Sequence, residues 1–389
     1  MAHHQRAAAK ALRRSANEEA IRHLRQALEA LRLVADETER TKAEINLRVA
    51  LGAAYMAMRG FGAPEVLEAY AEAERLCERL GDRADIFPAL WGQWLFRWGR
   101  SELESARQLS IRLLALAEKA GDAHLRLQAH HAMWPTAFGQ GRLSECDTHA
   151  EAGVTLYDPK AHQALASSYG NHDACCCARN FNTMSLALAG EETRARAMMS
   201  TVVLQAQKLD DPFTIALTFY FQSATAQILG DVALARSNAE FSLQTAIEHD
   251  LALPRAWSKG ITGWCAAAGG EHERGIALMN EAVTALRATQ SMVFMVYMLG
   301  LLADGYAKAG RDHDAMTAAD EAIATAESTG EHFYTSELHR LRGELLARAP
   351  SGRTQDAEAS LRTAIAVARR QGARRLEARA AESLRCVAS

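Results

Sequence analysis

Four glycines recur at one fixed interval in the chain. Gly190, Gly230, Gly270 and Gly310 are forty residues apart, and each follows an apolar run and precedes a polar turn. An apolar helix that ends on a residue able to adopt positive φ, followed by a polar turn, is typical of the connection between two helices. The spacing therefore predicts a stack of helical hairpins that repeats every forty residues or so.

Further positions keep this interval. Small residues follow each glycine by five positions, where the two helices of a hairpin are expected to cross closely: Ala195, Ala235, Gly275 and Ala315. The ends of the second helices recur at Gly81-Asp82, Gly121-Asp122, Asp210-Asp211, His249-Asp250, Thr289-Gln290, Thr329-Gly330 and Gln371-Gly372. The interval from Asp122 to Asp211 is too long for two repeats, which predicts an irregular segment near residues 157–173. Pro135 lies late in a helical pattern and predicts a kink or an early helix end.

The composition agrees with a helical chain. The 389 residues include only seven prolines, and alternating runs rich in Val, Ile and Thr are nearly absent. We therefore predict an all-α protein, a right-handed α-solenoid of tetratricopeptide-like hairpins. We expect a single superhelical domain over residues 1–389, with regular repeats at 175–372 and C-terminal capping helices up to 389.

Charge and cysteine content exclude several classes of partner. The formal net charge of −3 leaves no electrostatic footprint for nucleic acid over the whole chain. No apolar stretch of about eighteen residues occurs and no export signal is visible, so we expect no membrane partner. Seven cysteines, an odd number scattered over a long chain, favour reduced thiols and a cytoplasmic location. The oligomeric state is not assigned.

Five separated stretches carry a family resemblance. They are Leu51–Val66, Phe87–Gly92, Leu156–Pro159, Tyr169–Cys175 and Gly330–Leu346. In this order they resemble the C-terminal tetratricopeptide-repeat region of bacterial adenylate/guanylate cyclase-like STAND ATPase signalling proteins. The resemblance covers nearly the whole chain and concerns that repeat region alone. It implies a bacterial signalling role with a cyclase or ATPase component as a possible partner.

Catalytic motifs of such larger proteins are missing from the sequence. No Gly-x-x-x-x-Gly-Lys-[Ser/Thr] loop occurs, and no βαβ pattern of a cyclase or ATPase head is present. No Gly-x-Ser-x-Gly elbow is visible either. We therefore expect no enzyme activity and no cofactor.

Histidines and cysteines near the irregular segment suggest a metal site only weakly. Three consecutive cysteines, Cys175-Cys176-Cys177, point about 100° apart on a helix and cannot all face one metal ion. Small thiols packed between helices explain them better, so we assign no metal site. A local site of His172, Asp173 and Cys176 is the alternative. His130 and His131 lie in a helix, and in one reading a cleft unites them with His172, where neutral histidines bind a metal or transfer protons. No carboxylate or nucleophile lies at a fixed spacing from them, which favours structural or surface roles.

An aromatic stripe raises the possibility of a partner surface. Trp91, Trp94 and Trp98 share one helical face, and such stripes usually face the core. Alternatively, exposed tryptophans grip a partner peptide, with Arg97 and Arg100 holding an acidic one. The candidate partner-binding residues are Trp91, Trp94, Arg97, His130, His131, His172 and Arg179.

The patterns together favour a non-catalytic scaffold. The stacked first helices of the hairpins would line a concave groove that binds a partner protein or peptide. The alternative function is a sensor of a small ligand or metal that uses the irregular segment near residues 157–177. An enzyme would require a convergent acid–base pair that the sequence does not display.

Overall fold

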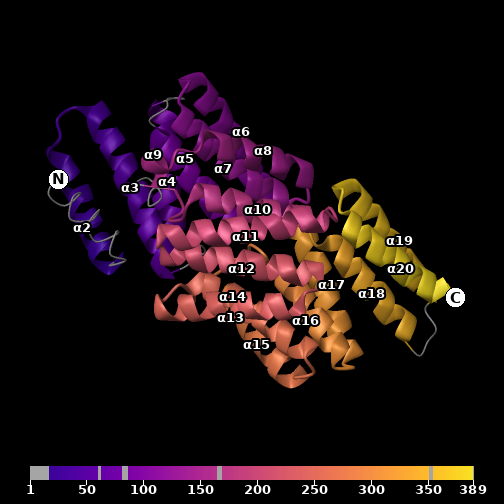
Figure 1. Cartoon of the computed structure of the whole chain (residues 1–389). Helices are drawn as coiled ribbons and strands as arrows, with labels where there is room; N and C mark the ends of the chain where they lie inside the picture. The colour runs from indigo at the N-terminus through magenta and orange to yellow at the C-terminus, as the bar shows by residue number, and fades with distance from the viewer. Residues whose placement is uncertain (1–16, 60–62, 81–85, 164–168, 350–353, 389) are drawn as a thin grey trace. The chain divides into compact units, whose positions relative to one another are not determined.

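The computed structural model of the chain describes residues 17–59, 63–80, 86–163, 169–349 and 354–388 (Figure 1). Helices and short connections make up these ranges, which contain no strand. The predicted all-α solenoid of tetratricopeptide type is confirmed. The helices are α2 (Asn17–Ala30), η1 (Leu31–Leu33), α3 (Glu37–Arg59), α4 (Pro64–Leu80), α5 (Phe87–Gly99), α6 (Leu103–Ala120), α7 (Ala123–Gly139), α8 (Leu143–Leu156), α9 (Pro159–His162), α10 (Ala174–Leu188), α11 (Glu192–Leu209), α12 (Pro212–Leu229), α13 (Val232–Glu248), α14 (Ala252–Ala268), α15 (His272–Ala288), α16 (Met295–Lys308), α17 (Asp312–Thr329), α18 (Thr335–Arg348), α19 (Thr354–Gln371) and α20 (Arg374–Ala388).

The chain divides into two compact units. The first unit contains residues 1–133, 152–174 and 288–292, and the second contains residues 134–151, 175–287 and 293–389. The single continuous domain expected from the repeat period stays a prediction. None of the helices that the structure describes combines the length and apolarity needed to cross a bilayer.

The four periodic glycines occupy the turns between helices, as predicted. Their φ angles are +81° at Gly190, +83° at Gly230, +91° at Gly270 and +73° at Gly310. At Gly230, the amides of the glycine and of Asp231 donate to the carbonyls of Gln227 and Ala226, at 3.0 and 2.9 Å. These bonds satisfy carbonyl groups that the end of α12 would otherwise leave open. The predicted helix end at Gly81-Asp82 lies outside the described residues.

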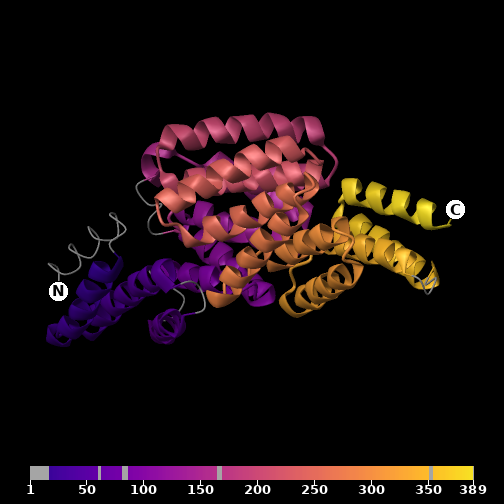
Figure 2. The same cartoon turned by 90° about the horizontal axis from the view of Figure 1, so that it is seen from below.

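The second unit consists of hairpins in which the first helix is enclosed and the second is amphipathic. Figures 1 and 2 show the helices of this unit running side by side. Nearly all side chains of α12 are buried, from Thr214 to Leu229. In contrast, α13 buries a single stripe of small residues, Ala235, Ala239, Ser242 and Ala246. The first helices therefore form the core of this unit, and the second helices cover it.

Aromatic rings of the enclosed helices meet in one core of the second unit. Phe294, immediately before α16, is at its centre and is 2% exposed. Its ring contacts six others, with centroids 5.2 to 6.4 Å apart: Phe138, Phe181, Tyr220, Phe221, Trp257 and Phe333. Phe294 has a φ of +63°, an unfavourable value for a bulky residue. Its amide donates to Oε2 of the buried Glu331 at 3.0 Å, and this bond helps to hold the turn.

The helix that contains Pro135 does not end early. Helix α7 continues through this proline to Gly139, so the expectation of an early helix end is wrong. Proline has no amide to donate to the carbonyl four residues before it, which belongs to His131. The packing of its neighbours compensates, because Trp134 and Phe138 are fully buried.

Helices α14 and α15 cross closely at Gly275. A Cβ atom added to Gly275 would lie 2.5 Å from the carbonyl oxygen of Gly263 and 2.6 Å from the amide nitrogen of Ala267. Both neighbours are backbone atoms and cannot move aside as a side chain does. The equivalent positions Ala195, Ala235 and Ala315 are fully buried and accommodate one methyl group.

We predict that Gly275→Ala lowers the free energy of unfolding by about 1–3 kcal/mol, because the methyl group forces α14 and α15 apart. Urea unfolding followed by circular dichroism measures the loss. Gly230→Asn is the matched control, since nothing lies within 4 Å of an added Cβ there and asparagine tolerates positive φ. The control should lose less than about 1 kcal/mol. Equal losses in the two variants would contradict the backbone clash.

Candidate functional site

Four of the seven predicted partner-binding residues come together in the first unit. Trp91 and Trp94 of α5 lie against His131 of α7, with ring centroids 5.5 and 6.3 Å apart. His172, from the segment before α10, lies 5.0 Å from His131 by the same measure. Tyr169, 5.2 Å from Trp91, completes what we name the aromatic–histidine cluster. The cluster thus contains Trp91, Trp94, His131, Tyr169 and His172.

The tryptophans of the cluster belong to the core. Trp91 and Trp94 are both 2% exposed. The indole nitrogen of Trp91 donates to the backbone carbonyl of Gln128 at 3.1 Å, which ties α5 to α7. The stripe therefore faces inward, as helical aromatic stripes usually do. As placed, these two rings lack the accessible surface that direct contact with a partner needs, and their partner-binding role stays a prediction.

A tight turn presents His172 to the cluster. Gly170 and Asn171 both have positive φ, +83° and +59°. A Cβ on Gly170 would lie 2.7 Å from Cε1 of His172 and 3.2 Å from the ring of Trp91. Glycine is therefore required at this position for the imidazole to pack where it does. The carbonyl of Gly170 also lies 2.7 Å from Nδ1 of His172.

Burial keeps the imidazole of His131 neutral. This side chain is 1% exposed, and burial followed by the proximity of His172 lowers its pKa well below the usual value. The pKa of His124, also on α7, is lowered by burial and then by His162. The His124 ring stacks on that of His162, 5.2 Å away, and meets Tyr169 at 5.4 Å. Neutral imidazoles are the form that accepts hydrogen bonds and binds metals.

The three remaining predicted residues lie outside the cluster. Arg97 pairs with Glu102 at an N–O distance of 2.5 Å, and the neighbouring Arg100 pairs with the same carboxylate at 2.8 Å. His130 is half-buried on α7. Arg179 belongs to α10 in the second unit and donates to Oε1 of Gln205. The partner-binding role of each stays a prediction.

The three consecutive cysteines are buried, in agreement with the predicted packing role. Cys175, Cys176 and Cys177 are 4%, 1% and 9% exposed. Cys176 packs against Val202 and Ala206 of α11. All seven cysteines of the chain are free thiols, and only Cys386 is exposed. Burial raises the pKa of Cys265 to about 12 and that of Cys146 well above its ordinary value, so neither is a ready thiolate.

Different contacts are seen for the members of the alternative ligand set, His172, Asp173 and Cys176, whose role stays a prediction. His172 engages Gly170 and His131. Asp173 accepts a hydrogen bond from the hydroxyl of Tyr157, and Cys176 packs on α11. Three residues close in sequence therefore have three different neighbours.

Sequence reasoning missed two residues that shape the site, Gln128 and Tyr169. Gln128 is 2% exposed, and its Oε1 atom is 3.2 Å from Nδ1 of His131. Tyr169 fills the space between α5 and α7, and its burial raises its pKa to about 12. The position of Tyr169 beside Gly170 in the irregular segment was the available signal. Gln128 offered none, since polar residues three apart on a helix are common.

Asp147 is the partly buried carboxyl with the clearest shift toward neutrality. Burial raises its pKa to about 6, against the lowering effect of hydrogen bonds from Ser185 and Asn182. The donors are Ser185 Oγ at 3.0 Å and Asn182 Nδ2 at 2.9 Å, both from α10 of the same unit. Both partners are neutral side chains, so the arrangement joins α8 to α10 and does not supply an acid–base pair.

Comparison with known proteins places the fold in a class. No protein-family model matches the sequence. Uncharacterized protein R02095 of Rhizobium meliloti (strain 1021) is 26% identical over 375 residues, which are 96% of this chain and 36% of that protein. The chain therefore spans about a third of the length of this curated relative.

Solved structures resemble the chain in fold. A Rap protein complexed with competence and sporulation factor matches 95% of this chain and 98% of its own, with a TM-score of 0.71 and 10% identity. PH0952 of Pyrococcus horikoshii, a STAND protein with a tetratricopeptide repeat sensor, covers 90% of this chain and 52% of its own, with a TM-score of 0.43 and 12% identity, too distant to carry an argument. The chain has a tetratricopeptide-like repeat fold.

We predict that Asp147→Asn removes part of the pH dependence of stability. The native carboxyl has a pKa of about 6 against an ordinary value of 3.8, so the native state binds more protons than the unfolded state between these values. The contribution of Asp147 to the free energy of unfolding therefore falls by about 3 kcal/mol in total as pH rises from about 4 to above 6. Over this range, the free energy of unfolding of Asp147→Asn should rise by the same amount relative to that of the wild type.

Urea unfolding at pH 4, 5, 6 and 7 tests this expectation. Asp250→Asn is the matched control, because its carboxylate is 95% exposed beside Arg255. The control curve should run parallel to that of the wild type. A parallel curve for Asp147→Asn as well would show that the carboxyl titrates normally in the folded protein.

Proposed function

We propose that this chain is a non-catalytic interaction module that binds a partner protein or peptide in a bacterial signalling system. The observation that supports it best is the likeness of nearly the whole chain to a Rap protein, at a TM-score of 0.71. That Rap protein is complexed with competence and sporulation factor. By analogy of fold alone, we infer that the helical repeats of this chain hold a partner.

The partner that we propose is a cyclase or ATPase component. Support comes from the resemblance of five stretches of the chain to the repeat region of cyclase-like STAND ATPase proteins. The relative R02095 is much longer than this chain, which covers 36% of it. A repeat module that works beside a further domain or a separate protein is consistent with that length. Buried, free thiols support a reducing cytoplasm as its location.

The contact surface that we propose is the turn between α5 and α6. Arg97 and Arg100 are 39% and 32% exposed there, and both guanidinium groups pair with the carboxylate of Glu102. An acidic segment of a partner would fit this surface. The buried rings of Trp91 and Trp94 pack α5 against His131 of α7. The proposed groove contacts of His130, His172 and Arg179 are secondary candidates.

A sensor of a small ligand or a metal is the second candidate function. The observation that favours it is the close approach of His131 and His172, whose Nε2 atoms lie 3.1 Å apart. A sensor and a scaffold are compatible, since a ligand can change which surface a repeat protein presents.

We expect the intact chain, purified from its own cells under native conditions, to retain a protein partner that mass spectrometry identifies. Arg97→Gln with Arg100→Gln should reduce the recovered partner by about tenfold, because charge-assisted contacts at an interface are worth about 1.5–3 kcal/mol. Arg362→Gln is the matched control: it is 65% exposed and also pairs with a glutamate, Glu358.

Two outcomes would contradict the proposal. Recovery of a small molecule in place of a protein would favour the sensor. If the double variant and the control recovered equal amounts of the partner protein, the α5–α6 turn would not be part of the contact surface.

A further inference from the structure

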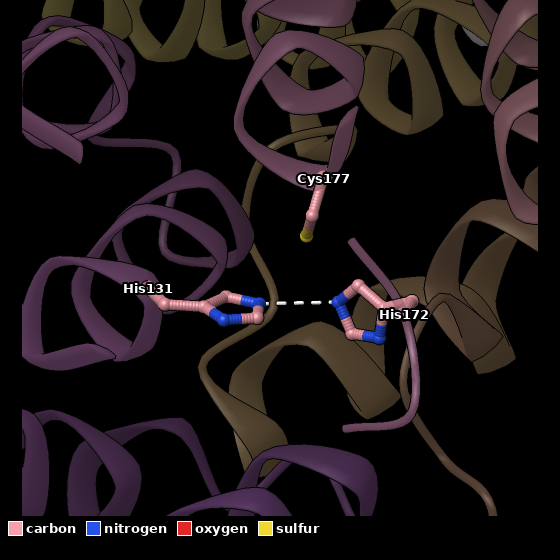
Figure 3. Close-up of side chains that lie close together, drawn as sticks. All are labelled: His131, His172 and Cys177. Carbon is pink, nitrogen blue, oxygen red and sulfur yellow. Dashed lines mark hydrogen bonds between the residues drawn. The ribbon is translucent and has the colours of Figure 1, made fainter. Parts of the chain in front are cut away.

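Two imidazole rings of the first unit point their Nε2 atoms at each other. His131 extends from α7 and His172 from the turn at residues 169–173, and the two Nε2 atoms are 3.1 Å apart (Figure 3). The two residues are 41 positions apart in the sequence, so the fold alone brings them together. One ring is buried and the other is partly exposed, which leaves an approach for a small solute from one side.

The proton positions on these rings follow from their other neighbours. Nδ1 of His172 lies 2.7 Å from the carbonyl oxygen of Gly170, which only accepts hydrogen bonds. This nitrogen therefore carries the proton of the neutral ring, and Nε2 carries a lone pair. Nδ1 of His131 likewise faces an oxygen, Oε1 of Gln128, at 3.2 Å. With the amide in this orientation, both Nε2 atoms present lone pairs to each other.

Two facing lone pairs repel unless a positive charge lies between them. A shared proton would make the pair cationic, and that charge is disfavoured at the His131 ring, which is 1% exposed. A rotated Gln128 amide would give His131 the other tautomer and an ordinary hydrogen bond to His172. A metal ion satisfies both lone pairs and keeps both Nδ1 hydrogen bonds as they stand.

The geometry agrees with metal ligation in two respects. Two nitrogens at 2.0–2.1 Å from a tetrahedral zinc ion are about 3.3 Å apart. This value is close to the 3.1 Å between the two Nε2 atoms, whereas a linear arrangement needs about 4 Å. Histidines that bind metals usually donate their other nitrogen to a carbonyl or carboxylate, which fixes the ring. Gln128 and Gly170 provide such acceptors for His131 and His172.

We propose that His131 and His172 bind a Zn²⁺ ion through their Nε2 atoms. Water or a further donor would complete the tetrahedral shell. The ion would tie the irregular segment at 169–173 to α7. It would act within the first unit, independently of the proposed partner contact at α5–α6.

The test uses the full-length protein, stripped of metal by a chelator and titrated with Zn²⁺ in a calorimeter. We expect one ion per chain. His172→Asn should weaken binding at least about tenfold, because one of the two nitrogen ligands is lost. His130→Asn, a half-buried neighbour on α7, should bind as the wild type does. Absence of binding by the wild type, or equal binding by His172→Asn, would overturn the proposal.

A further measurement keeps the test decisive if a variant folds poorly. Nitrogen NMR of the wild type should show both rings with the proton on Nδ1 when Zn²⁺ is added, and both Nε2 resonances shifted. A shift of the Nδ1 resonances in place of the Nε2 resonances, or no shift at all, would overturn the site.

Discussion

The helices of a hairpin approach each other most closely where one of them carries a small side chain. Ala195, Ala235 and Ala315 are such positions, each with a buried methyl group. At Gly275 the backbone of the facing helix occupies the space that even a methyl group would need. Once the helices are this close, the turn between them must reverse within a few residues, which requires a left-handed residue at a fixed distance before the crossing. The glycine period, the enclosed first helices and the aromatic core of the second unit all depend on this close contact.

Much of the fold could be predicted from the sequence because its determinants are local. A glycine before a polar turn specifies positive φ by sterics alone, and Gly190, Gly230, Gly270 and Gly310 all adopt it. The burial of the cysteines at 175–177 was also expected, because free cysteine is among the most buried residue types. The early helix end at Pro135 was a wrong prediction, since α7 continues to Gly139, and a kink at this residue stays a prediction.

The candidate site depends on contacts that no local pattern reveals. The partner of His131 lies 41 positions away, and the orientation of each ring depends on Gln128 and Gly170. A periodic pattern places Trp91 and Trp94 on one face but does not say whether that face is covered. The positive φ of Phe294 could not be predicted either, because it depends on the buried carboxylate of Glu331 and on six surrounding rings.

The cysteine distribution has a practical consequence for studying the motions of this protein. Six thiols are enclosed by helices and one, Cys386, is exposed near the C-terminal end of α20. In the folded chain, an alkylating reagent will therefore modify Cys386 first, at a rate set by the reagent. Each enclosed thiol can react only when its own helices separate, so its rate of labelling measures how often that part of the stack opens. The chain thus contains natural reporters of local unfolding in both units, from Cys77 on α4 to Cys265 on α14.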